Sequence, residues 1–119
     1  MIEAHRRTLD ELRARARALG VRLGEKLAGM DEEDAARAAL SGLASEGLCA
    51  WAVPERDGGA ATGGLAAEYY VSVRALGVLR DELAWHSGML DVMLVMQGLG
   101  SFPVALGGSA RLRKEVLPS

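Results

Sequence analysis

Apolar residues recur at helical spacing over the first quarter of the chain. Between residues 3 and 27, leucine and alanine repeat at steps of three and four, which places them on one face of a helix with 3.6 residues per turn. These positions are Leu9, Leu12, Ala16, Leu19, Leu23 and Leu27. Gly20 and Gly24 fall in the last turns of this predicted helix, where each weakens it by ~1 kcal/mol relative to alanine.

The same spacing predicts two further helices, over residues 31–46 and 65–86. Asp31 is a typical N-cap, and the acids that follow it suit the positive end of the helix dipole. One apolar face of the next helix consists of Tyr69, Val73, Leu76, Leu79 and Leu83. Because other sides of that helix are apolar too, we expect it to be covered on more than one side. We expect Gly77 to mark a close helix crossing, and we interpret His86 as a polar helix end rather than a catalytic base.

A fourth helix is predicted over residues 88–106, and it is apolar on nearly every side. Its apolar run is too short for a transmembrane helix, which needs ~20 such residues. A helix of this kind is either central core or the wall of an apolar cavity. The residues alone favour core, and we expect Met93 and Met96 to pack inside the bundle. Ser109 is expected to cap a short last helix over 110–117.

The stretch LASEGLCAWAVPERDGG predicts a fixed corner between the second and third helices. Gly47 stands where a helix C-cap needs a left-handed residue. The run 48–53 is almost wholly apolar, so we expect it to be buried and extended. Pro54 favours an extended conformation at the residue before it, and Gly58-Gly59 allow a sharp reversal.

Taken together, these patterns predict an all-α fold: one domain, a bundle of about four long helices plus a short C-terminal one.

The chain of 119 residues carries a net charge of −2 with acids and bases interspersed, which argues against a nucleic-acid or membrane-surface partner. We interpret the run Arg13, Arg15 and Arg17 as a solvated helix face. Cys49 is the single cysteine, so a cysteine metal cluster is excluded. The charged N-terminus lacks a signal-peptide core, which favours a cytoplasmic protein.

The corner stretch resembles the segment before the third long helix in the N-terminal domain of acyl-CoA dehydrogenases. A second block resembles the same family: Leu83-Ala84 within DELAW, followed by GLGSFPVALGGSARLRKEVLPS. The two blocks stand in the family's order and at about its spacing. The resemblance implies that residues 1–119 form the N-terminal helical domain, and that the family's middle β-barrel and C-terminal four-helix domain are absent from this chain.

The resemblance also implies a function, the FAD-dependent α,β-dehydrogenation of an acyl-CoA or acyl-carrier-protein thioester. Further expected partners are an electron-transfer flavoprotein and the enzyme's remaining domains or subunits, in a homo- or hetero-oligomer. The family's catalytic glutamate and main FAD contacts lie in the other domains, so no catalytic, cofactor-binding or metal residue is assigned here and the chain alone is expected to be inactive. The resemblance does place one wall of the acyl pocket on the fourth helix, with Asp91, Val92 and Val95 as its candidates. The alternative is a stand-alone helical interaction module that kept the fold without catalysis.

Overall fold

A computed structural model describes the chain over residues 2–67 and 70–117. Over these residues it is built from α-helices and 3-10 helices without strands, which confirms the predicted all-α fold. The α-helices are α1 (Ile2–Ala28), α2 (Glu32–Ser45), α3 (Val73–His86), α4 (Gly88–Gly107) and α5 (Ala110–Val116). Two 3-10 helices, η1 (Cys49–Ala52) and η2 (Glu55–Asp57), lie between α2 and α3.

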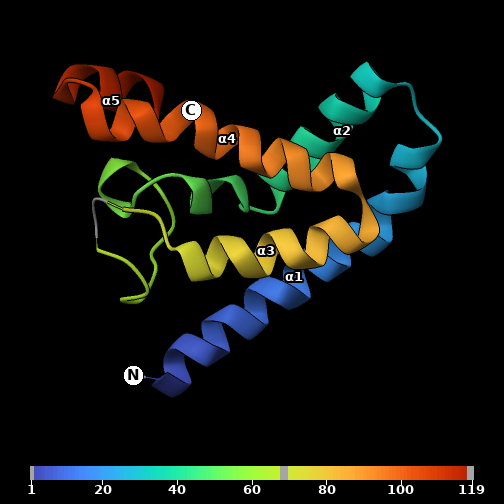
Figure 1. Ribbon diagram of the computed structural model, residues 1–119, viewed down its shortest axis with the longest axis horizontal. Coiled ribbons are helices and arrows are strands. Elements are labelled where there is room, and N and C mark those ends of the chain that lie inside the picture. Colours follow the sequence, from blue (N-terminus) through green and yellow to red (C-terminus); the bar gives the residue numbers. More distant parts are fainter. Residues whose placement is uncertain (1, 68–69, 118–119) are drawn as a thin grey trace.

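The helices form a thin slab of 41 × 35 × 17 Å (Figure 1). α3 and α4 are joined at Ser87 and run in opposite directions, α1 packs against α3, and α2 packs against α4. η1 contacts both α3 and α4 and fills the space between them. Fully buried leucines from the four long helices and the corner form the core: Leu12, Leu19, Leu43, Leu48, Leu79, Leu83, Leu90 and Leu94.

The crossing of α1 and α3 depends on two glycines of α1. A Cβ at Gly20 would lie 2.4 Å from the His86 ring, and one at Gly24 would lie 2.9 Å from the His86 carbonyl oxygen. Our interpretation of these glycines as weak points of the helix was therefore incomplete. They allow the end of α3 to approach α1 more closely than any larger residue would permit.

The arginines of α1 lie on a solvent-accessible face, as predicted, since Arg15 and Arg17 are exposed and Arg13 is half-exposed, but they also join helices. Arg17 Nε donates to Glu82 Oε1 at 2.6 Å, and Arg13 Nη1 lies 3.9 Å from Glu82 Oε2. Glu82 is buried on α3, where an unpaired carboxylate would be costly. Arg15 donates to the carbonyl oxygen of Glu46 at the end of α2. Alternate residues of α1 thus contact two different neighbours, which the spacing alone did not indicate.

α3 begins eight residues later than predicted, at Val73 rather than at residue 65. Ser72 is its N-cap, and its side chain accepts a hydrogen bond from Ala75 N at 3.1 Å. The buried Thr62 stabilises a turn just upstream, since its hydroxyl lies 3.3 Å from the Ala66 carbonyl oxygen. Apolar residues continue at helical spacing through this turn, so the sequence pattern did not indicate that Ser72 is the N-cap.

The predicted apolar face of α3 is confirmed only in its second half. Leu79 and Leu83 are fully buried, and Leu76 packs partly against the core. Val73 is 81% exposed, so its assignment to the buried face was wrong. Tyr69 lies outside the described residues.

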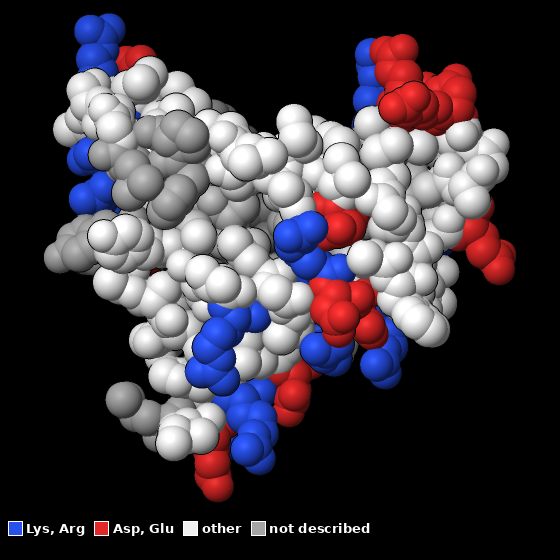
Figure 2. Space-filling view, viewed as in Figure 1, with Lys and Arg blue, Asp and Glu red and all other residues white. Residues whose placement is uncertain are grey.

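The face of the molecule seen in Figure 2 has a charged part and a largely uncharged part. Figure 2 shows acidic and basic side chains at the tip of α2, along the side where α1 and α3 lie and near α5, whereas the surface over α4 is largely uncharged in this view. Among the exposed apolar residues of α4 are Val92, Met96 and Leu99.

Candidate functional site: an apolar groove between α3 and α4

The corner after α2 is fixed by local hydrogen bonds. Gly47 has the predicted left-handed conformation, with φ +71°. This conformation lets Gly47 N donate to the Ala44 carbonyl oxygen and Leu48 N donate to the Leu43 carbonyl oxygen, both at 3.0 Å. This pair of bonds is the Schellman motif that ends many helices. Leu48 then enters the core with no exposed surface.

Beyond Leu48 the predicted burial is confirmed at Trp51 and Ala52, the other residues up to Val53 are half-buried, and the chain is not extended. Cys49–Ala52 form the 3-10 turn η1, and only Val53, held by the proline that follows it, is extended at φ −118° and ψ 135°. The compact turn places the small buried side chain of Ala52 between α3 and α4. The chain then turns back so closely on Val53 that Gly59 has to be glycine, because a Cβ there would lie only 1.8 Å from the Val53 carbonyl oxygen.

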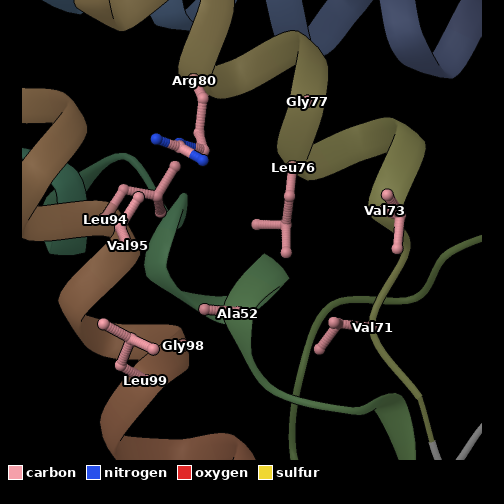
Figure 3. Close-up of a pocket in the computed structure, with 10 residues that line it drawn as sticks. All are labelled: Ala52, Val71, Val73, Leu76, Gly77, Arg80, Leu94, Val95, Gly98 and Leu99. Atoms are coloured by element: carbon pink, nitrogen blue, oxygen red, sulfur yellow. The ribbon is translucent and has the colours of Figure 1, made fainter.

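Above Ala52, α3 and α4 diverge to form a groove of about 360 Å³ (Figure 3). Its lining comes from α3, α4, η1 and the segment before α3: Ala52, Val71, Val73, Leu76, Gly77, Arg80, Leu94, Val95, Gly98 and Leu99. Of these residues, Arg80 is the single charged one, and the others are apolar or glycine. Such a lining suits a hydrocarbon chain far better than a polar ligand.

Two glycines leave this groove open. A Cβ added at Gly77 or at Gly98 would meet no other atom within 4 Å. The prediction that Gly77 marks a close helix crossing was therefore wrong, because it faces empty space. A larger residue at either position would extend into the groove.

Arg80 and Asp91 form an ion pair between α3 and α4. Arg80 Nε donates to Asp91 Oδ1 at 2.9 Å, and Nη2 lies 3.5 Å from Oδ2, so the guanidinium contacts both carboxylate oxygens. This hydrogen bond and the negative charge of Asp91 raise the pKa of Arg80 above its ordinary value.

The structure brings some of the predicted wall residues to this groove and not others. Val95 lines it, and Asp91 contacts it through Arg80. Val92 is 52% exposed and is not among the lining residues. Met93 packs partly against the core, but Met96 is 53% exposed, so its placement inside the bundle was wrong for this chain.

Sequence reasoning missed the α3 side of the groove. It assigned the wall to one helix, whereas the cavity lies between two helices and rests on η1. A usable signal was present in the sequence. Arg80 and Asp91 carry opposite charges and lie on either side of the short connection between the predicted helices 65–86 and 88–106. Such residues can form an ion pair if the two helices pack side by side.

Other polar groups of the described residues do not form a comparable site. Burial raises the pKa of the Cys49 thiol above its ordinary value, which disfavours the reactive thiolate. Among the described residues, no three or more histidine, cysteine, aspartate or glutamate side chains lie close enough together to hold a metal. None of their helices combines the length and hydropathy required to cross a membrane.

The sequence was compared with protein-family models, with curated proteins and with solved structures. Residues 3–119 match the model described as acyl-CoA dehydrogenase, N-terminal domain. No curated protein and no solved structure gave a match. The matched region covers both the corner and the α3–α4 hairpin that form the groove, so the chain belongs to the family of acyl-CoA dehydrogenase N-terminal domains.

Proposed function

We propose that this chain is the N-terminal helical domain of an FAD-dependent acyl-CoA dehydrogenase-like oxidoreductase, and that the groove between α3 and α4 is one wall of its acyl-chain site. The observation that carries the proposal is the chemistry of the lining, in which every described residue except Arg80 is apolar or glycine. An acyl chain placed there contacts Val95 on α4 and Leu76 on α3. Each methylene that it buries contributes up to ~0.8 kcal/mol to binding.

In such an enzyme FAD would supply the oxidising chemistry. A flavin dinucleotide carries a diphosphate, which proteins bind with several hydrogen-bond donors or a helix N-terminus. The groove does not fit it, because its described lining offers a single charged side chain, Arg80, already paired with Asp91. We therefore assign FAD and the catalytic base to the other domains of the enzyme.

The proposal includes the partners that this function needs. They are an acyl-CoA or acyl-carrier-protein thioester, the remaining domains or subunits in a homo- or hetero-oligomer, and an electron-transfer flavoprotein, in a cytoplasmic setting. Uncharged surface over α4, including Met96 and Leu99, is available for contact with those domains. Residues 1–119 then constitute one domain whose task is to hold the acyl chain and support the fold.

Two glycine substitutions on the same helix test the acyl site. Gly98 lines the groove and Gly100 does not, yet an added Cβ meets nothing within 4 Å at either position. We expect NMR titration of the chain with the octanoyl thioester of N-acetylcysteamine to shift the methyl signals of Val95 and Leu76. Gly98→Leu fills the groove and should weaken binding at least ~tenfold, a loss equivalent to about two buried methylenes. Gly100→Leu should leave the affinity unchanged.

The outcomes separate the domain of an enzyme from an interaction module. Equal affinities for Gly98→Leu and Gly100→Leu would mean that the thioester binds elsewhere. Absence of any saturable shift would favour a stand-alone module without an acyl site. We also expect the purified chain to be colourless, and tight stoichiometric FAD binding would place the flavin site on this domain instead.

A further inference from the structure

The Arg80–Asp91 pair lies across one end of the groove. α3 and α4 are antiparallel, so the lining residues of α3 follow the groove from Val73 towards Arg80 and the hairpin turn. Arg80 is the last of them, and its side chain reaches across to Asp91 on α4. The groove therefore has an apolar end near Val73 and Leu99 and an ionic end at the hairpin.

A hydrocarbon chain cannot pass the ionic end without loss. The side chain of Asp91 is 18% exposed and that of Arg80 is 54% exposed, so water still reaches the guanidinium. If the methyl end of the acyl chain covers the Arg80 guanidinium, it removes this hydration and provides no hydrogen bond in return. A chain that displaces Arg80 instead leaves the mostly buried Asp91 carboxylate without its partner, which is also unfavourable.

From this geometry we infer that the Arg80–Asp91 pair determines the length of acyl chain that the domain accepts. The inference rests on the proposed acyl site. Val73 and Arg80 are seven residues apart on α3, and at ~1.5 Å per residue the groove between them is about 10 Å long. An extended chain of about eight carbon atoms spans that distance, since each C–C bond of ~1.5 Å advances by less than its own length. Arg80 and Asp91 thus act as specificity-determining residues that do not touch the reacting carbons.

A series of N-acetylcysteamine thioesters measures this limit directly. Affinity for the 119-residue chain is determined by NMR titration with the butanoyl, hexanoyl, octanoyl, decanoyl and dodecanoyl thioesters. Full burial of one CH₂ corresponds to about a fourfold gain in affinity, and one side of the groove is open, so we expect about two- to fourfold per methylene up to octanoyl. From octanoyl to dodecanoyl the affinity should stop rising.

Three double variants identify the cause of the limit. Arg80→Met with Asp91→Leu removes the pair, and the affinity should then continue to rise through dodecanoyl. Arg80→Glu with Asp91→Arg restores a pair of opposite orientation and should restore the limit. The matched control is Glu33→Leu with Arg37→Met, which removes the exposed 2.8 Å pair on α2, far from the groove, and should behave as the unmodified chain.

The possible results distinguish this inference from the proposed function. If the affinity of the unmodified chain rises steadily through dodecanoyl, or if the apolar double variant keeps the limit, the pair does not set the length. If the reversed pair folds but lacks the limit, charge pairing is not its cause. If no thioester binds at any length, both the acyl site and the length limit are refuted. Far-UV circular dichroism establishes that each variant is folded before titration.

Discussion

Replacing Gly20 with alanine tests whether the α1–α3 crossing depends on the missing side chain. The added Cβ would lie 2.4 Å from His86 Cγ and Cδ2 and 2.7 Å from His86 Cβ. A rotation of the ring does not relieve this contact, because the His86 Cβ is itself too close, so α1 and α3 have to separate. Overpacking of this kind costs ~1–3 kcal/mol in the free energy of unfolding.

Helix propensity opposes this cost and has to be removed from the measurement. Alanine is favoured over glycine by ~1 kcal/mol inside a helix, so Gly20→Ala alone could appear nearly neutral. Gly77→Ala supplies the matched control, since Gly77 is interior to α3 and an added Cβ meets nothing within 4 Å. Gly77→Ala should stabilise by ~1 kcal/mol, and the difference between the two variants should equal the contact cost of ~1–3 kcal/mol.

Urea unfolding followed by far-UV circular dichroism gives both free energies. His86→Ala removes the ring atoms nearest to the new Cβ, so the double variant Gly20→Ala/His86→Ala should be more stable than the sum of the two single changes predicts. A coupling of ~0.5 kcal/mol or more is expected for residues in such contact. Equal stabilisation by Gly20→Ala and Gly77→Ala, or strict additivity with His86→Ala, would refute the close crossing.

Two further predictions concern the corner and α4. Gly47→Ala should destabilise the chain by ~1 kcal/mol, because φ at this position is +71° and alanine is strained there, and urea unfolding measures the change. Leu94→Ala should lower the free energy of unfolding by ~2–5 kcal/mol, since Leu94 is only 1% exposed. The half-exposed Met96 should tolerate alanine with a change of no more than ~0.5 kcal/mol. Similar losses at both positions would contradict the assigned orientation of α4.

Features that depend on neighbouring residues in the chain were predictable from the sequence. Asp31 and Ser109 accept N-cap hydrogen bonds, and Gly47 ends α2, because each needs only a few adjacent residues to form its motif. The late start of α3 was missed because the competing cap, Ser72, lies within a continuous apolar pattern.

Features that depend on contacts between distant segments were not predictable in the same way. α4 is apolar on nearly all sides, so its sequence did not indicate that Leu94 is buried while Met96 and Val92 face outwards. The glycines show the same limit, since Gly20 lies at a crossing and Gly77 faces a groove, although both are single glycines inside helices. The groove needed both sides of the hairpin and η1 to be placed before its lining could be recognised.

The position of η1 between α3 and α4 has a consequence for how the chain folds. η1 precedes both helices in the sequence, yet the Ser101 hydroxyl of α4 lies 3.1 Å from the Ala52 carbonyl oxygen, across a separation of 49 residues. The Arg13–Asp81 pair between α1 and α3 spans 68 residues. During synthesis, α1, α2 and η1 therefore leave the ribosome before the surfaces that bury them exist, and their leucines remain uncovered until the hairpin is complete. Loop closure over such distances makes folding slower than in a bundle of sequence-adjacent helices.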